Sequence, residues 1–453
     1  MKPYSSYKPS GVPWLGDVPC HWEVARIRFR AALNPGASRP LDADALLSFL
    51  PMEAIGDDGV LNLERVRTVA EVSSGYTYFE ERDVAIAKIT PCFENGKGAV
   101  MQGLCGDAGF GTTELIVMRP DDRVVPKWLY YLTMCRAFRS PGEAMMLGAG
   151  GQKRVPDLFV KDYSAGFPAI DEQQAVANYL DTETARIDEL IREKEGLIGL
   201  LREYRRAVIA DHTTGVSRGG SRTPTGNVFC PSVPAGWAMV RLGKYSRIGN
   251  GSTPLKDNAE FWSGGAFPWL NSAVVNQDEV FEGSEYVTAE ALRACHLPVV
   301  EAGAVLVALT GQGKTRGQAT VLRIQATINQ HLAFIALDPE RLNADYVFWT
   351  LTGMYEALRM VSDGQGGTKG ALTCEDLSRF EIPMPPLPDQ QDIARKVAKE
   401  TARIDELIAH TKDEMSLLKE LRAATIAEAV LGRIDVRTSS TAGKPAKSNN
   451  PSV

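Results

Sequence analysis

The chain has 453 residues, which is long enough for two or three domains with full hydrophobic cores. Its 44% hydrophobic and 23% charged residues are typical of a soluble globular protein, and no apolar run reaches the roughly 18 residues that a membrane span needs. The formal net charge of −6 argues against a free-standing nucleic-acid binder without excluding one, because charge on a local binding face matters more than the sum.

Cysteine and histidine usage indicates the compartment and the absence of a metal site. The seven cysteines are scattered, and no pair has the short spacing of a zinc site or a redox motif. The five histidines form no cluster with metal-ligand spacing, and residues 1–7 lack the apolar core of a signal peptide. We therefore expect a cytoplasmic protein with reduced thiols, no membrane segment and no bound metal.

Residues 1–170 form the first predicted domain. Short β-like runs alternate there with Gly, Pro and Asn turns, which predicts a mixed α/β domain with a mostly antiparallel sheet. Residues 84–89 are expected to form a strand that enters a polar loop at 90–98. A second loop with Gly, Gln and Lys lies at 150–154.

A long helix is predicted over residues 171–212, and its sequence returns later in the chain. Residues 183–191 (Glu-Thr-Ala-Arg-Ile-Asp-Glu-Leu-Ile) recur unchanged at 400–408, an offset of 217 positions. Apolar positions at alternating spacings of three and four predict a heptad seam in which polar residues such as Glu183 and Lys194 interrupt the a and d positions. We expect the two copies to pair antiparallel about a pseudo-twofold axis. The alternative is that each helix packs on its own domain.

The second half repeats this plan. A Gly-, Ser- and Thr-rich linker is predicted at 213–229, a second α/β domain at 230–388, a second helix at 389–431 and a disordered tail at 437–453. In the second domain a strand at 304–309 enters the loop 310–316. Polar residues 329–331 match 112–114 of the first domain, and a further Gly/Gln/Lys loop lies at 365–369.

Signs of catalysis are almost absent. Residues 308–315 satisfy the loose phosphate-binding pattern A-x-x-x-x-G-K-[ST]. A true phosphate-binding loop is followed directly by a helix, whose N-terminus binds the phosphates. The residues that follow here are interrupted by a glycine and have a β-like pattern. We interpret this segment as a turn that carries Lys314 and Arg316, and His331 as a structural residue. Because the polar loops occur in both halves, and their side chains are of the kinds that pair with base edges and phosphates, nucleic-acid recognition is the better interpretation.

Several motifs together resemble one known family. They are the Val-Pro-x-x-Trp openings at 18–22 and 233–237, the Gln-Gln helix entries at 173–174 and 390–391, and the repeated helix sequence. Over residues 7–436 the chain resembles the specificity (S) subunit of type I restriction-modification systems.

The resemblance implies a non-catalytic, DNA-binding subunit. Each globular segment would be a target recognition domain that reads one half of a bipartite, asymmetric site in double-stranded DNA. The helices would form an antiparallel coiled coil that sets the spacing and docks two modification (methyltransferase) subunits, and two restriction subunits would join where the host encodes them. S-adenosylmethionine would belong to the modification subunits, and ATP with Mg²⁺ to the restriction subunits. A stand-alone or decoy DNA-binding protein and an NTP-binding enzyme that uses residues 308–315 stay open as alternatives.

Candidate site residues follow by position in the loops and in the helix seam. The candidate DNA contacts of the first domain are Lys88, Thr90, Asn95, Lys97, Gln152, Lys153 and Arg154. Those of the second domain are Thr310, Gln312, Lys314, Arg316, Asn329, Gln330 and Lys369. The candidate coil contacts are Ile187, Leu190, Leu201, Ile404, Leu407 and Leu418.

Overall fold

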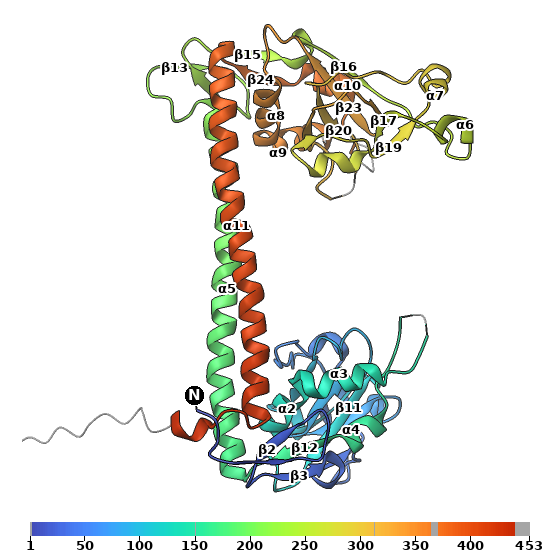
Figure 1. The fold of residues 1–453 in the computed structure, drawn as a ribbon, viewed down its shortest axis with the longest axis vertical. Helices are drawn as coiled ribbons and strands as arrows, with labels where there is room; N and C mark the ends of the chain where they lie inside the picture. The colour runs from blue at the N-terminus through green and yellow to red at the C-terminus, as the bar shows by residue number, and fades with distance from the viewer. Residues whose placement is uncertain (1, 150, 312, 364–369, 440–453) are drawn as a thin grey trace, which may run out of the picture. The chain divides into compact units, whose positions relative to one another are not determined.

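The computed structural model describes residues 2–149, 151–311, 313–363 and 370–439. Gln312, Lys369 and nearly all of the predicted tail lie outside these residues. The chain divides into two compact units, which are described separately: unit 1 comprises Met1–Lys194 with Asp413–Val453, and unit 2 comprises Glu195–Lys412. Both are mixed α/β units, which confirms the predicted fold class at this level (Figure 1).

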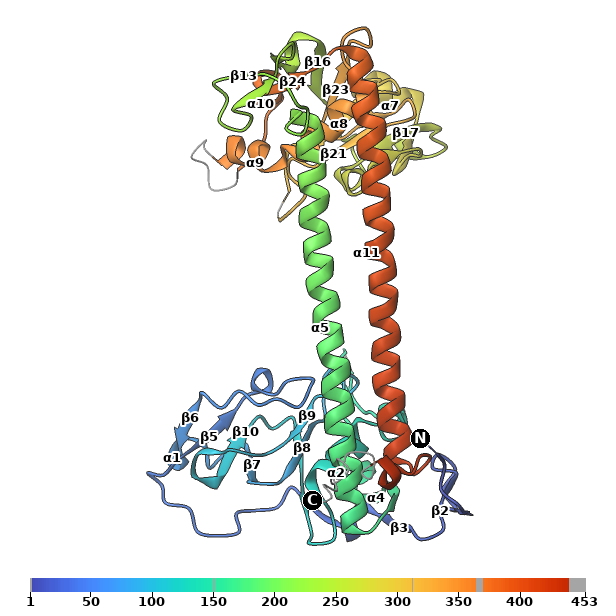
Figure 2. The same ribbon diagram turned by 90° about the vertical axis from the view of Figure 1, so that its left-hand side faces the viewer.

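Unit 1 contains two four-stranded sheets and two strand pairs. Its strands are β1 (Tyr7–Pro9), β2 (Asp17–Pro19), β3 (Glu23–Arg26), β4 (Ala31–Leu33), β5 (Leu46–Leu50), β6 (Val66–Thr68), β7 (Thr77–Glu80), β8 (Val84–Ala87), β9 (Gly98–Val100), β10 (Ala108–Gly111), β11 (Leu115–Pro120) and β12 (Ser164–Phe167). Its shorter helices are α1 (Val69–Val72), α2 (Pro126–Met134), α3 (Arg136–Ala144) and α4 (Asp157–Asp162). The sheets have the orders β6-β5-β10-β7 and β4-β11-β8-β9, and the strands of the first lie next to one another in Figure 2.

Strand β8, which leads into the first predicted loop, lies at the centre of the first domain. All its residues are buried, and they alternate between two cores as the two-residue period of a strand requires. Val84 and Ile86 face one core together with helix α2, whereas Ala85 faces the other. Because the strand is covered on both faces, only the loops at its ends are free to contact a ligand.

Unit 2 is organised in the same way around a five-stranded sheet. Its strands are β13 (Arg222–Pro224), β14 (Ser232–Pro234), β15 (Ala238–Arg241), β16 (Ser246–Asn250), β17 (Phe267–Leu270), β18 (Glu279–Val280), β19 (Glu285–Val287), β20 (Val305–Ala308), β21 (Ala319–Leu322), β22 (Thr327–Ile328), β23 (Leu332–Leu337) and β24 (Glu381–Met384). Its shorter helices are α6 (Ala259–Trp262), α7 (Ala289–Ala294), α8 (Ala344–Gly353), α9 (Tyr355–Asp363) and α10 (Cys374–Arg379).

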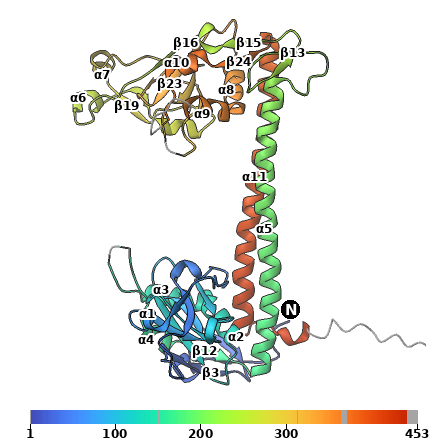
Figure 3. The same ribbon diagram turned by 180° about the vertical axis from the view of Figure 1, so that it is seen from behind.

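The five-stranded sheet has the order β16-β23-β20-β21-β18, and a smaller sheet has the order β19-β17-β22. Strands β16 and β23 of the first sheet and β19 of the second are labelled in Figure 3. Strand β20 is the counterpart of β8: Val305 and Val307 face the core that contains α8, and Leu306 faces the other core. Most strand pairs in both units are antiparallel, as predicted, whereas β5–β10, β17–β22 and β18–β21 are parallel. Short 3₁₀ helices lie at Ile27–Phe29, Met52–Ala54, Cys105–Asp107, Leu242–Lys244, Ser272–Asn276 and Val436–Ser439.

The two long helices begin and end close to the predicted positions. Helix α5 spans Ile170–Thr214 and α11 spans Leu387–Val430. The predicted linker 213–229 contains strand β13, which pairs with β14, so this segment is part of the second unit's structure.

Each long helix is fixed to its domain by a buried glutamine. The Nε2 of Gln173 donates to the carbonyl oxygens of Pro168 and Arg123, and its Oε1 accepts from the amide of Val125. Gln390, 217 positions later, makes the same three bonds, with Pro385, Arg341 and Asn343. A fully hydrogen-bonded buried amide fixes direction as well as position, since each lost bond would leave a buried group unsatisfied.

Each Val-Pro-x-x-Trp motif packs against the glycine turn that follows a long helix. Gly432, after α11, has a φ of +70°, and a Cβ there would lie 2.6 Å from Pro19 and 2.9 Å from Trp22. Gly215, after α5, has a φ of +63°, and a Cβ would lie 2.6 Å from Pro234. Any other residue would meet both backbone strain and a clash, so glycine is required at both positions.

The buried face of the helices agrees with the predicted seam at the a positions and differs from it at the d positions. Ile187 and Ile404 are buried, and Leu190, Leu201 and Leu418 are partly buried, but Leu407 is 49% exposed. The neighbouring Ile408 is 8% exposed, and Ile198 is 7% exposed beside Leu197 at 40%. The buried stripe therefore runs through positions 184, 191, 198 and 205 and through 401, 408, 415 and 422, one residue later than the predicted d positions. Adjacent Leu and Ile residues make both stripes apolar, and packing decides between them.

Ion pairs join the two helices inside each unit. In unit 1 the Nε of Arg422 lies 2.8 Å from Asp188 Oδ1, and Lys194 Nζ lies 2.6 Å from Glu414 Oε2. In unit 2 Arg205 pairs with Asp405 at 3.0 Å, and His212 with Glu400 at 3.3 Å. In both units the residue numbers rise along α5 as they fall along α11, so the paired segments run in opposite directions.

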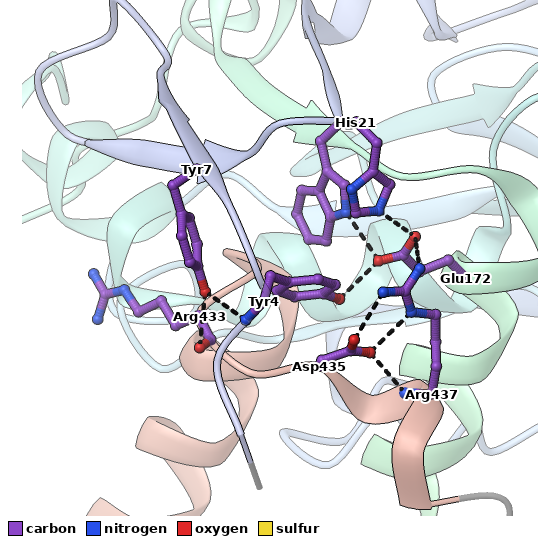
Figure 4. Close-up of polar contacts among 8 residues, drawn as sticks. Tyr4, Tyr7, His21, Glu172, Arg433, Asp435 and Arg437 are labelled. Carbon is purple, nitrogen blue, oxygen red and sulfur yellow. Dashed lines mark hydrogen bonds and ion pairs between the residues drawn. The ribbon is translucent and has the colours of Figure 1, made fainter.

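Glu172 forms a buried polar cluster at the start of α5 (Figure 4). Its carboxylate is 5% exposed and accepts hydrogen bonds from Tyr4 at 2.7 Å and from the Trp22 indole at 2.9 Å, while His21 Nε2 lies 2.8 Å away. Arg437, after α11, lies 3.7 Å from the same carboxylate. Burial and the Glu172 carboxylate raise the pKa of Tyr4, so its hydroxyl stays protonated and donates. The cluster thus ties the first residues of the chain to the beginning of α5 and to the segment after α11.

The buried stripe can be tested with a matched pair of variants. Ile408→Asp places a charge on the buried face and should lower the free energy of unfolding by about 3 kcal/mol or more. Leu407→Asp, one residue earlier on the exposed face, should change it by less than about 0.5 kcal/mol. Denaturant unfolding of the full chain, followed by circular dichroism, measures both. Equal losses would show that the stripe is assigned incorrectly.

The Glu172 cluster predicts a difference between two equivalent carboxylates. Glu172→Ala removes the acceptor of Tyr4 and Trp22 in a buried site and should cost about 2–4 kcal/mol of stability. Asp389, its counterpart 217 positions later, has a side chain 37% exposed and an ion pair with Arg218 at 2.7 Å. Asp389→Ala should therefore cost less than about 1 kcal/mol. Similar changes in the unfolding of both variants would contradict the special role of Glu172.

Candidate nucleic-acid interface

The two predicted loops of the first domain meet at Thr90. Its hydroxyl donates to the carbonyl oxygen of Gly151 at 2.6 Å and accepts from the amide of Lys153 at 3.0 Å. The amide of Thr90 in turn donates to the carbonyl oxygen of Lys153 at 2.9 Å. Thr90 is therefore used to hold the loops together, and it leaves the side chains of Gln152 and Lys153 exposed.

Arg154 is held by an acidic residue of the same surface. Its guanidinium forms a two-pronged pair with Glu114, with Nη2–Oε1 and Nε–Oε2 distances of 2.7 and 2.9 Å. This pair, with a smaller effect of Lys88, lowers the pKa of Glu114, and the pKa of Arg154 is raised. An anion that binds Arg154 must compete with Glu114, so the exposed Lys153 is the more accessible cation of this loop.

The 90–98 loop presents fewer side chains for contact with DNA than its sequence indicates. Lys97 donates to the carbonyl oxygen of Met52 at 3.2 Å and lies 3.9 Å from Asp57, so its charge is directed into its own domain. Asn95 is exposed, and Lys88 is partly buried at the end of β8.

In the second domain, helix α9 anchors the loop that follows β20. The hydroxyl of Tyr355 donates to the carbonyl oxygen of Lys314 at 2.8 Å, and Arg359 donates to the carbonyl oxygen of Gly313. The backbone is held by these two contacts while the Lys314 side chain is exposed. Such a fixed loop with a free cationic side chain can bind a phosphate at little cost in conformational entropy.

Two predicted contacts of this domain are structural. Arg316 is 6% exposed and donates to the carbonyl oxygen of Gly370, and Asn329 is 5% exposed and accepts from the amide of His331 at 3.0 Å. Both side chains are turned into the domain, where they hold loops, and their contact with DNA stays a prediction. Sequence alone does not distinguish a loop cation that points outward from one that ties two loops together.

A row of polar side chains, two exposed and two partly buried, lies next to the loop. Thr253 donates to Gln330 Oε1 at 2.6 Å, Gln330 Nε2 lies 3.2 Å from His331 Nε2, and His331 Nδ1 lies 2.8 Å from Thr310 Oγ1. The sequence predicted Thr310 and Gln330 but missed Thr253 and interpreted His331 as structural. The position of His331 next to Gln330 in the sequence could have indicated its role. Thr253 comes close to Gln330 only because β16 pairs with β23.

The structure does not support the nucleotide-binding interpretation. The next element of regular structure after β20 is strand β21, so the described residues of 308–315 provide no helix N-terminus for a phosphate. Within the residues that the structure describes, no group of three or more His, Cys, Asp or Glu side chains is arranged to hold a metal. Of the described helices, none is long and apolar enough to cross a membrane.

Comparison with known proteins finds a family match in the second half of the chain. Residues 234–416 match the family described as type I restriction modification DNA specificity domain. This range covers the second globular domain and the first part of α11.

Two curated relatives are specificity subunits of Escherichia coli enzymes. The chain is 36% identical over 187 residues to the type I restriction enzyme EcoEI specificity subunit, which is 41% of this chain and 31% of that protein. It is 39% identical over 163 residues to the EcoAI specificity subunit, which is 35% of this chain and 27% of that protein. The chain thus spans less than a third of the length of these relatives.

A solved structure matches over nearly the whole chain. It comes from work on complex assembly and conformational transition of the type I R-M system, with a TM-score of 0.74 and 18% identity, and the match covers 92% of this chain and 99% of the other. At this identity the match shows the fold. The family match supports, for residues 234–416, the resemblance that the sequence motifs predicted.

Proposed function

We propose that this chain, which is similar to the specificity subunits of type I restriction enzymes, is the DNA sequence-recognition subunit of such a complex. The observation that carries the proposal is shared by both domains. In each, a central strand buried on both faces leads to loops that are held by hydrogen bonds, and the loop surface at its end presents exposed lysine and glutamine side chains: Lys153 and Gln152 in the first domain, Lys314 and Gln330 in the second. These are the side chains that pair with phosphates and base edges.

The two target recognition domains, residues 1–170 and 230–388, each read one half of a bipartite site. Their loop surfaces carry different chemistry, which supports an asymmetric site. The first presents Gln152, Lys153 and a guanidinium shared with Glu114, whereas the second presents Thr310, Gln330 and His331. Different donors and acceptors select different bases.

The helices at 171–212 and 389–431 form an antiparallel coiled coil that sets the spacing of the half-sites in a pseudo-twofold tandem repeat. The ion pairs within each unit support opposite helix directions, and the equivalent bonds of Gln173 and Gln390 support the repeat. The polar residues of the stripe, Thr184, Lys194 and Arg205 in α5, fix the register at some cost in stability.

The partners of the subunit are two modification subunits that dock on the helices, with two restriction subunits where the host encodes them. The chain itself catalyses nothing. S-adenosylmethionine binds to the modification subunits, and ATP and Mg²⁺ bind to the restriction subunits. The shared work of holding DNA accounts for the net charge of −6, since the partners contribute phosphate contacts of their own. The complex works in the cytoplasm, where the DNA is.

The role can be tested by expressing the chain with the modification subunit of the same organism and mapping methylated adenines by sequencing. We expect methylation at a single bipartite motif, and loss of that methylation when either recognition domain is deleted. A stand-alone DNA-binding protein would instead bind DNA tightly alone, form no complex and produce no methylation, and that result would refute the proposal.

Lys314→Ala should weaken DNA binding of the assembled methyltransferase several-fold on all sequences. Because a phosphate contact is lost, the slope of log K against log salt concentration should also fall by about one. Lys244→Ala, an exposed lysine of the same domain outside the loops, is the control. Titrations at several salt concentrations measure both variants. An unchanged slope for Lys314→Ala would remove this loop from the interface.

A further inference from the structure

The geometry of the second domain points to Gln330 as the residue that reads an adenine in its half-site, with Thr253 and His331 as positioning residues. This inference rests on the proposed function and goes beyond it, because it names one base and the groups that select it. It is argued from the hydrogen bonds of the Gln330 amide.

Gln330 is exposed, yet its amide is held at both ends. Its Oε1 accepts from the hydroxyl of Thr253 at 2.6 Å, and its Nε2 lies 3.2 Å from His331 Nε2. An amide nitrogen only donates, so His331 Nε2 must accept. The ring therefore carries its hydrogen on Nδ1, which donates to Thr310 Oγ1 at 2.8 Å.

The histidine ring is placed by the backbone of its own residue. The amide of His331 donates to Asn329 Oδ1 at 3.0 Å, and its carbonyl oxygen accepts from the amide of Leu309 at 2.9 Å. These two bonds tie the residue to the end of β20 and to the turn before β23. The buried Asn329, which does not reach the surface, thus acts on recognition through His331.

Counting donors and acceptors shows what the amide can still bind. A glutamine amide has two N–H groups and two acceptor positions on oxygen. Among the described residues, Thr253 occupies one acceptor position and His331 one N–H. One donor and one acceptor are left, in the orientation that these two bonds give the amide.

Adenine is the base whose major-groove edge matches this remaining pair. It offers N7 as an acceptor and the N6 amino group as a donor, side by side. Guanine offers two acceptors, cytosine a donor and thymine an acceptor, so each leaves at least one group of the amide unpaired. An unpaired polar group at an interface from which water is excluded is costly, and this gives the selection.

The fold does not require Gln330, and this makes the assignment testable by substitution. The side chain is exposed, and its hydrogen bonds are to the polar side chains of Thr253 and His331. Gln325, also exposed and hydrogen-bonded once, to Glu301 at 2.8 Å, is a matched control in the same domain.

The experiment is motif mapping by adenine methylation with the complex of full-length chain and modification subunit. For Gln330→Ala we expect the preference for adenine at one position of one half-site to fall by about ten- to a hundred-fold, with the other positions unchanged. For Gln330→Glu, whose carboxylate only accepts, the preference at that same position should move toward cytosine. Gln325→Ala should leave the motif as it is.

His331→Ala tests the positioning role. It should weaken discrimination at the same base pair as Gln330→Ala and leave binding to unrelated DNA unchanged. The inference is overturned if the Gln330 variants keep the wild-type motif, lose preference uniformly at all positions, or change a base other than adenine. A wild-type chain that directs no motif at all would instead refute the proposed function.

Discussion

One buried glutamine fixes each long helix to its domain, and the rest of the structure depends on that constraint. Gln173 and Gln390 each use one side-chain amide to bind the loop before the domain's helix, α2 or α8, and the strand end that leads into the long helix. A planar amide with three bonds tolerates neither rotation nor displacement of its partners. The direction in which each helix leaves its domain is therefore set at one residue. This role of the first glutamine explains why the Gln-Gln dipeptide occurs at the start of both long helices.

The loops of the recognition surfaces are also held in place by side-chain hydrogen bonds. Thr90 joins two loops through backbone bonds, and Tyr355 and Arg359 hold the backbone of the Lys314 loop. The side chains that support a loop and those that are available to DNA are therefore different residues. This division explains why Arg316, Asn329 and Lys97, which are of the right chemical type, face their own domain. A rigid support reduces the entropy lost on binding and leaves the exposed side chains free to differ between proteins.

Within the domains, charged side chains are largely neutralised by nearby groups of opposite charge. Arg154 is paired with Glu114, and Arg119 lies 2.8 Å from the buried Asp83. Glu172 gathers the polar groups of three separate segments. The exposed lysines of the loops are few, so the binding free energy expected from phosphate neutralisation by this chain alone is small. Specific contacts such as that of Gln330 then carry a larger share of the selection.

The sequence by itself determined the two-part plan, the helix bounds to within two residues, and the strands that lead into the loops. Repeats and hydrophobic period are local properties, and burial on both faces leaves a readable apolar run at 84–87 and 305–308. Only the tertiary structure decided which helix face is buried. Leu407 and Ile408, or Leu197 and Ile198, are equally apolar neighbours, and packing chose the second of each pair. It also decided which loop side chains point outward, because Thr253 reaches Gln330 only through strand pairing across 77 residues of sequence. Hydrogen bonds between such distant residues leave no periodic trace in the sequence.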